Sequence, residues 1–426
     1  MSTIEDFLSF LNQSPTAWHA VRCAAERLKA AGFTELSEQT AWSLQNGRGY
    51  FVLRNGSSLC AFVTPENLPT HVRLIGSHSD SPALKLKPKP EFHRENMLMF
   101  GVEVYGAPLL SSWLNRDLGL AGRIVYQDCQ DNILEALVNL KKHPLVIPQL
   151  AIHLDRNVNE QGLLLNKQEH LSALAALANG TKLTKDSYLQ TLLEEELGSL
   201  NLLAHDLFLV PIEEARFMGY EKQMIASYRI DNLSSVHASL MALVQNKTPH
   251  SSMLKMITFW DNEEIGSETA QGVASPFVSH TTERIVYALN GQRENYLRLI
   301  SQSLCVSVDL AHALHPNYLE KHEPRHQPIL GKGIVLKYNA QQRYASDART
   351  SAVIASLCQE AKLPLQKFVA RSDMPCGSTI GPIHAHLTGM PTVDIGSPQL
   401  SMHSARELMA CQDHLDMCEL LSSVLT

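Results

Sequence analysis

The sequence predicts an α/β fold in which a mixed sheet carries helices on both faces and is interrupted by an inserted, mostly β domain. Three observations predict it: apolar runs end in polar clusters, helical segments separate these runs, and the middle of the chain has a different texture. With 426 residues, 44% of them hydrophobic, the chain exceeds the roughly 250 to 300 residues at which one hydrophobic core stops growing. We therefore expect a main domain formed by residues 1–91 and 226–426 and an insert formed by residues 92–225.

The first sixty residues predict two helices and the start of a sheet. Apolar residues repeat at helical spacing from Ile4 to Leu11, and Ser14-Pro15 opens a second helix that Gly32 closes. Two β-rich runs flank Asn55-Gly56, and both of these residues tolerate positive φ. This pattern predicts a β-hairpin at the beginning of the sheet.

Further along the chain, short apolar strands alternate with helices. The predicted strands are Val72–Gly76, KMITFW before Asp261, CVSV before Asp309 and TVDI before Gly396. Helices are predicted at Leu233–Val244, Ala348–Ala361 and Glu407–Leu421. The alternation indicates a sheet with covered faces. The insert shows β-like stretches such as MLMFGVEVYG, and no polar cluster follows them.

Charge and composition exclude several classes of protein. The net charge is −7 and no long Lys/Arg run is present, so we expect neither nucleic acid nor a membrane surface as a partner. The N-terminus does not resemble a signal peptide, and no apolar run approaches the roughly 18 to 20 residues that span a bilayer. We expect a cytoplasmic protein. Its eight cysteines form no CxxC pair, which favours reduced thiols and a metal bound through nitrogen and oxygen.

Three clusters of histidine and carboxylate residues directly follow predicted strands. They are GSHSDS at 76–81, WDNEEIGS at 260–267 and SVDLAHALHPNY at 307–318. Because the carboxyl ends of strands line the ligand crevice of open α/β sheets, residues far apart in sequence converge there. A metal site needs such convergence.

Each residue of these clusters also has a purely structural interpretation. His78 alone is more often a surface or core histidine, but Asp80 is near enough to orient a metal-bound imidazole. Asp231 could simply cap the helix that starts at Leu233. Glu263 and Glu264 could form a solvated acidic turn, or one could bind metal while the other handles a proton.

Eight sequence blocks resemble, in order and over nearly the whole chain, the signature blocks of the aspartyl aminopeptidase family of two-zinc metallopeptidases, in its bacterial form. The blocks are GSHSDSPALKLKP, LNRDLGLAGR, IHLDRNVN, RIDNLSSVHASL, WDNEEIGS, DLAHALHPNYLEKHEPRH, MPCGSTIGP and GSPQLSMHSARE. The resemblance implies a zinc-peptidase catalytic domain with an inserted dimerisation and oligomerisation domain. It implies removal of N-terminal residues, Asp or Glu above all, from short peptides by a metal-activated hydroxide.

The resemblance also implies the metal shell. Asp231 bridges two zinc ions per subunit, His78 and Asp309 complete one, and Glu264 and His403 complete the other; manganese or cobalt can substitute. Two Zn²⁺ and three carboxylates leave a charge of +1, which favours ionisation of a bridging water. Glu263 remains as the catalytic, proton-handling carboxylate, with Asp80 behind the metal-bound imidazole.

A second group of residues is implied on the substrate side. His153 would reach a neighbouring subunit's active site and associate with zinc or substrate, or else be a structural histidine. Lys337 interrupts an apolar strand, so it needs either exposure on an edge strand or an anionic partner such as a substrate carboxylate. Asp373 would orient the site and Gly377 would offer a backbone donor, although Met374 departs from the Thr or Ser of the family.

The resemblance further implies dimers and a tetrahedral dodecamer whose active sites face an interior reached by short peptides. Two alternatives stay open. One is a two-zinc amidohydrolase or deacetylase on the same scaffold, which would prefer blocked amines. The other is an inactive assembly protein, which the ligand-capable side chain at every metal position argues against.

Overall fold

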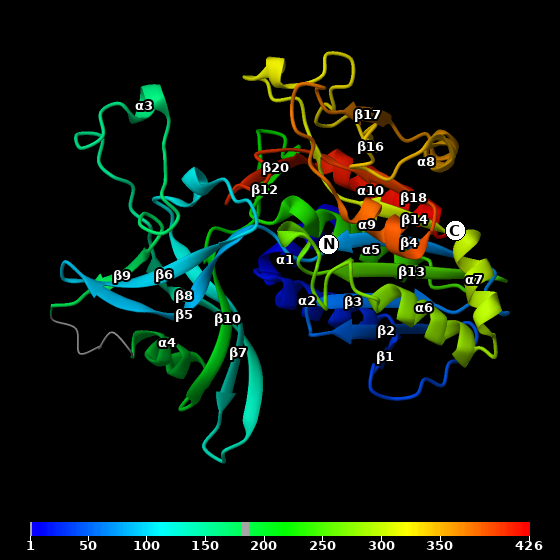
Figure 1. Cartoon of the computed structure of the whole chain (residues 1–426), viewed down its shortest axis with the longest axis horizontal. Helices are drawn as coiled ribbons and strands as arrows, with labels where there is room; N and C mark the ends of the chain where they lie inside the picture. The colour runs from blue at the N-terminus through cyan, green and yellow to red at the C-terminus, as the bar shows by residue number, and fades with distance from the viewer. Residues whose placement is uncertain (1, 180–186) are drawn as a thin grey trace. The chain divides into compact units, whose positions relative to one another are not determined.

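The structure, a computed structural model, describes residues 2–179 and 187–426 (Figure 1). Contacts group the chain into two compact units. The larger unit consists of Met1–Asp80, Ala215–Met402 and Glu407–Thr426, and the second consists of Ser81–Glu214 and His403–Arg406. The inserted domain expected at residues 92–225 stays a prediction.

The larger unit is built on a mixed sheet, which has nine strands within the described residues. The neighbours from β13 to β18 are parallel to one another. Strand β3 pairs antiparallel with β13, and β16 pairs antiparallel with β18. In spatial order the strands are β1 (Thr34–Leu36), β2 (Gly49–Arg54), β3 (Ser58–Val63), β13 (Met253–Trp260), β4 (His71–His78), β14 (Leu304–Val308), β18 (Thr392–Gly396), β16 (Ile334–Tyr338) and β17 (Leu365–Val369).

Helices cover both faces of this sheet, which confirms the predicted fold class (Figure 1). Side chains alternate between the faces along each strand, so that Ile75 packs into one core and Leu74 into the other. One face is covered by α1 (Thr3–Gln13), α2 (Ala17–Ala30), α5 (Ile230–Gln245), α8 (Ala348–Ala361) and α10 (Cys411–Val424). The other is covered by α6 (Phe277–Ala288), α7 (Arg293–Ser301) and α9 (Ile380–Thr388).

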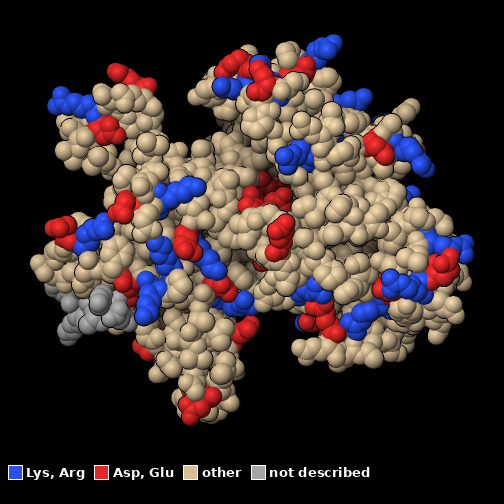
Figure 2. All heavy atoms as spheres, in the orientation of Figure 1, with Lys and Arg blue, Asp and Glu red and all other residues tan. Residues whose placement is uncertain are grey.

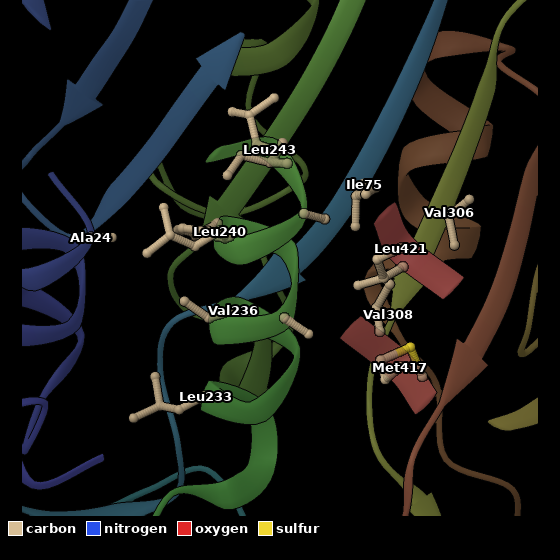
Figure 3. Close-up of a cluster of buried hydrophobic side chains, with 14 of the residues drawn as sticks. Ala24, Ile75, Leu233, Val236, Leu240, Leu243, Val306, Val308, Met417 and Leu421 are labelled. Carbon is tan, nitrogen blue, oxygen red and sulfur yellow. The ribbon is translucent and has the colours of Figure 1, made fainter. Parts of the chain in front are cut away.

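Helix α5 lies at the centre of the larger core. Figure 3 shows apolar side chains of α5 near α2 on one side, and side chains of α10 near those of β14 on the other. The labelled residues are Ala24, Ile75, Leu233, Val236, Leu240, Leu243, Val306, Val308, Met417 and Leu421. Burial of such side chains contributes roughly 1.5 to 3 kcal/mol each. The start of α5 is thereby fixed against the strands that carry the polar clusters.

Smaller elements complete the two units. The larger unit adds a short sheet with the order β11 (Arg216–Met218), β12 (Met224–Ser227), β20 (Glu407–Ala410), β19 (Pro398–Leu400) and β15 (Ala311–His312), and the 3₁₀ turns η2 (Glu263–Ile265) and η3 (Leu319–Lys321). The second unit is mostly β: β8 (Ile133–Leu145), β7 (Leu118–Gln127), β10 (Asn201–Pro211), β5 (Ala83–Arg94), β6 (Met97–Tyr105) and β9 (Ala173–Leu177), with η1 (Leu110–Trp113), α3 (Val158–Gln161) and α4 (Tyr188–Leu197).

Several predicted elements are confirmed and two need correction. The two N-terminal helices, the hairpin at Asn55-Gly56 and the helix at Ala348–Ala361 are present. Strand β4 continues through His78 instead of ending at Gly76, because His78 lies opposite Trp260 of the neighbouring strand. Glu407–Ala410 is strand β20 and not the first turn of a helix, since it pairs with β12 and β19.

Charged side chains of both signs are interspersed over the face drawn in Figure 2, without a large field of Lys and Arg. Within the residues that are described, helices of the length and apolar character needed to cross a membrane are absent.

Candidate metal centre

Three neighbouring strands bring the predicted clusters together. Strand β4 runs parallel to β13, with His78 opposite Trp260, and it also runs parallel to β14 on its other side. The carboxyl ends of these strands therefore lie at one edge of the sheet. His78 ends β4, the turn η2 follows β13, and Asp309 follows β14. The predicted convergence of the three clusters is confirmed.

Asp80 holds two of these clusters in register. Its Oδ1 accepts a hydrogen bond from the backbone N–H of Glu263, and its Oδ2 accepts one from that of Glu264, both at 3.1 Å. The ring Nδ1 of His78 lies 3.3 Å from the same Oδ1 and 3.2 Å from the Asp80 carbonyl oxygen. Oxygen atoms at these positions only accept, so Nδ1 carries the ring proton.

The other ring nitrogen of His78 faces carboxylates. Its Nε2 lies 3.6 Å from Oδ1 of Asp231 and 3.5 Å from Oδ1 of Asp309. Burial lowers the pKa of His78, but hydrogen bonds to Asp309 and Asp80 raise it well above its ordinary value. Between the two anionic oxygens, Nε2 therefore either carries a second proton or, as a neutral imidazole, binds a metal cation there. One imidazole nitrogen and two carboxylate oxygens, all buried or nearly so, form a donor set that suits zinc.

The start of α5 places Asp231 in this cluster. Its backbone (φ −80°, ψ 111°) is not helical although it lies within the helix bounds. Its N–H donates to Oε2 of the buried Glu407 at 2.9 Å. The neighbouring Arg229, also buried, donates to the carbonyl oxygen of Ser79. Both segments that carry ligand candidates are thus tied down through their backbones.

Glu263 and Glu264 sit on η2 and are half-buried. One carboxylate oxygen of each lies within 4.8 Å of a ring nitrogen of His78. Burial raises the pKa of Glu263 well above its ordinary value, His78 opposes this, and the carboxylates of Glu264 and Asp309 raise it further. A group held in this way is a better proton acceptor than an ordinary carboxylate.

Lys337 supplies the positive charge beside Asp309. The lysine is 2% exposed, and its Nζ lies 3.5 Å from Oδ2 of Asp309. Burial by itself would raise the pKa of Asp309, but Lys337 and His78 hold it below its ordinary value. The alternative of an edge-strand lysine facing water is wrong, because β16 lies between β18 and β17. The anionic partner in the structure is Asp309.

Four further predicted residues are described here by their local surroundings. His403 belongs to the segment that groups with the second unit, where its Nδ1 donates to the Ala107 carbonyl oxygen at 3.1 Å, leaving the lone pair on Nε2. His153 is exposed in the second unit. Asp373 is exposed and paired with Arg371 at 2.6 Å. Gly377 is exposed, and a Cβ added there would meet open space. Their roles stay predictions.

Two buried charged residues at the site were missed by the sequence analysis, namely Arg229 and Glu407. Arg229 begins the block RIDNLSSVHASL and Glu407 ends the block GSPQLSMHSARE. A charged residue is rarely buried without a partner, but sequence alone does not show which charged residues are buried. Their positions beside ligand candidates were the available signal.

The comparison with known families decides the identity. A family model described as aminopeptidase I zinc metalloprotease (M18) matches residues 10–424. The chain belongs to this family. The predicted resemblance is confirmed, and the chain is a metalloaminopeptidase, a hydrolase that acts on peptide N-termini.

Relatives match along nearly the whole length. A probable M18 family aminopeptidase 2 of Streptomyces avermitilis is 43% identical over 415 residues, which cover 96% of this chain and 94% of the relative. One of Clostridium novyi is 41% identical over 418 residues, which cover 96% and 95%. A chain in the cryo-EM structure of the Ape4 and Nbr1 complex has a TM-score of 0.94 and 36% identity, and the match covers 99% of this chain and 85% of that one. An M18-family crystal structure from Thermotoga maritima, at 22% identity, has a TM-score of 0.87 and covers 99% and 95%, which shows the fold.

Proposed function

We propose that this M18 aminopeptidase binds two zinc ions and removes N-terminal Asp or Glu from short peptides. The observation that carries the proposal is that Nε2 of His78 lies 3.6 Å from Oδ1 of Asp231 and 3.5 Å from Oδ1 of Asp309. Glu263 lies beside the same imidazole. Metallopeptidase chemistry needs such ligands together with a carboxylate that is near the metal but does not bind it.

Five residues would hold the zinc ions: His78, Asp231, Glu264, Asp309 and His403. Asp231 would serve both ions, as the family resemblance implies; its Oδ1 lies 3.6 Å from Nε2 of His78, and its backbone N–H is held by Glu407. Bound zinc supplies an activated water nucleophile and polarises the scissile carbonyl.

Glu263 takes up the proton of the attacking water at a carboxylate oxygen and delivers it to the leaving amine. Burial and two neighbouring carboxylates raise its affinity for that proton. Asp80 supports the step by fixing the backbone of Glu263 and Glu264, so that the two side chains keep separate roles. It acts as a positioning residue.

The preference for an acidic N-terminal residue is assigned to Lys337. Its buried ammonium group lies 3.5 Å from Oδ2 of Asp309, one of the ligand candidates, and can attract a carboxylate. Asp373 and Gly377 would line the same side of the site, with the Gly377 N–H as a donor. His153 would approach the active site of a neighbouring subunit and contact substrate or zinc there.

Self-association into dimers and a tetrahedral dodecamer is part of the same proposal. One similar solved structure, 28% identical with a TM-score of 0.85, is described as an Ape1 dodecamer of S. cerevisiae. The second unit carries strongly exposed apolar side chains, among them Leu154 at 74% and Leu164 at 91%. Exposed apolar surface of this kind is typical of contact regions.

The experiment uses aminoacyl substrates that differ only in the charge of the side chain, Asp, Glu, Asn and Leu, with and without a chelator. We expect Asp and Glu to be turned over fastest, loss of activity with the chelator, and recovery when two zinc ions per chain return to the catalytic site. Equal rates for Asp and Asn would contradict the acidic preference. Faster turnover of N-acetylated substrates would favour the amidohydrolase alternative.

A further inference from the structure

A second buried cluster of ligand-type side chains lies in the helical layer of the larger unit, formed by His237 on α5 and by His414 and Cys418 on α10. One ring nitrogen of each histidine and the sulfur lie within 4.8 Å of one another. The two imidazoles are fully buried and the cysteine is half-buried. None of the three has a part in the catalytic proposal.

The orientation of His237 is set by an acidic residue. Oδ2 of Asp6 lies 2.9 Å from Nε2 of His237 and 2.8 Å from Nη1 of Arg27. The carboxylate accepts, so Nε2 carries the ring proton and Nδ1 presents its lone pair to the cluster. A carboxylate behind a histidine in this way is the usual outer partner of a metal-bound imidazole.

His414 and Cys418 complete a three-atom donor set. Nε2 of His414 lies 3.0 Å from Nδ1 of His237 and 3.7 Å from Sγ of Cys418. In a tetrahedral zinc site, bonds of about 2.0 Å to nitrogen and about 2.3 Å to sulfur separate the ligand atoms by roughly 3.3 to 3.5 Å. The ring of His414 is stacked on Phe7, with 4.1 Å between centroids, which fixes its plane.

We propose that His237, His414 and Cys418 bind a zinc ion that joins α5 to α10, separate from the catalytic metal. Hydrogen bonds alone make Nε2 of His414 serve both Nδ1 of His237, at 3.0 Å, and Sγ of Cys418, at 3.7 Å, whereas a cation engages all three atoms at once. The soft thiolate favours zinc over magnesium or calcium. Because Cys418 is half-buried, an ion could enter the site past this side chain, and a water molecule could serve as its fourth ligand.

Cobalt tests the site, because none of the proposed catalytic ligands is a cysteine. Full-length protein freed of metal is titrated with Co²⁺, and thiolate-to-cobalt charge-transfer absorption is recorded in the near ultraviolet. We expect this absorption in the wild type, its loss in Cys418→Ser, and its retention in the matched control Cys411→Ser, a half-buried cysteine of the same helix whose Sγ donates to the Lys222 carbonyl.

A second measurement is independent of the spectrum. Zinc content should fall by one ion per chain in Cys418→Ser, while hydrolysis of aminoacyl substrates remains within twofold of the wild type. Absence of thiolate absorption in the wild type at saturating Co²⁺ overturns the proposal, as does its persistence in Cys418→Ser. Failure of this site would leave the catalytic proposal untouched, since the two clusters share no residue.

Discussion

At the scale of single residues, Asp80 shows how one carboxylate can organise a metal centre without being a ligand. It orients the imidazole of His78 and accepts two backbone N–H groups from η2. The ring proton of His78 and the directions of Glu263 and Glu264 therefore depend on the same side chain. Outer partners of this kind typically change metal affinity or activity 10- to 100-fold when they are lost.

Glu263→Gln should keep its zinc and lose turnover. The amide occupies the same volume but does not take up a proton, and general acid–base catalysis contributes about 10²- to 10⁴-fold. We expect kcat to fall by at least about 10²-fold, with the zinc content of the purified protein unchanged. Glu264→Gln is the matched control, which should lose bound zinc. A near-normal rate in Glu263→Gln would mean that the roles of the two glutamates are reversed.

From the sequence we could predict those candidate site residues that directly follow an apolar strand. His78, Glu264 and Asp309 come at the ends of apolar runs, and strand ends converge by the rules of parallel sheets. Asp231 and His403 were assigned through the family resemblance alone. The partners that only a folded chain brings close, such as Glu407 for Asp231 and Asp309 for Lys337, have no local signal.

At the scale of elements, the contact between β18 and the chain after β14 controls the position of Asp309. A Cβ added to Gly396 would lie 1.8 Å from the Asp309 carbonyl oxygen. The same segment is paired through the Asp309 N–H, which donates to the Ile395 carbonyl at 3.0 Å. A glycine is required here because the two backbones approach too closely for any side chain.

Gly396→Ala should therefore displace Asp309 and weaken metal binding. We expect a loss of activity of at least about tenfold, partly restored by excess zinc, because shifts of about 1 Å at catalytic groups are costly. Gly101→Ala serves as the control, since an added Cβ there meets only ordinary contacts from 3.6 Å. Equal activity in both variants would show that the strand adjusts without moving Asp309.

The first turn of α10 carries a second element-scale prediction. Burial raises the pKa of Asp413 to about 7. The hydrogen bonds that its carboxylate accepts from the N–H groups of Gly331 and Gly333 lower this pKa but do not outweigh burial. Because the folded pKa lies above the unfolded value, the folded chain binds more protons between pH 4 and 7. The contribution of Asp413 to stability is fully present below about pH 4 and is lost as the pH rises through 7.

Asp413→Asn removes this titration. Between pH 5 and 7 the wild type should lose about 2 kcal/mol of unfolding free energy relative to the variant. Unfolding midpoints at both pH values measure the difference, and Asp416→Asn on the same helix is the control. A pH dependence that is identical in the wild type and Asp413→Asn would contradict the prediction.

Helices with long segments were predicted best, and short strands were predicted worst. Helix α1 follows from apolar spacing over about three turns, and α2 follows from the boundary residues Ser14-Pro15 and Gly32. Glu407–Ala410 was assigned to a helix as the start of the segment Glu407–Leu421, and only its pairing with β12 and β19 makes it a strand.

At the scale of the whole molecule, the proposed assembly makes a direct prediction of mass. We expect a particle of about twelve times the chain mass of 47.3 kDa in light scattering. Leu164→Asp should reduce it, because a charge would be placed in a desolvated contact. Leu387→Asp in the larger unit, where the leucine is 51% exposed, is the matched control. A stable wild-type monomer would contradict the assembly.

The pairing of β4 with β13 has a consequence for the order of events in the cell. His78 and Trp260 are opposite each other in the sheet but 182 positions apart in the sequence. At about 5 to 20 residues per second, a ribosome needs roughly 10 to 40 s to pass from one to the other. During that interval the first half of the centre exists without Glu263, Glu264 or Asp309. The nascent chain therefore carries the His78 segment without either of its sheet partners, β13 and β14, long before it becomes a peptidase.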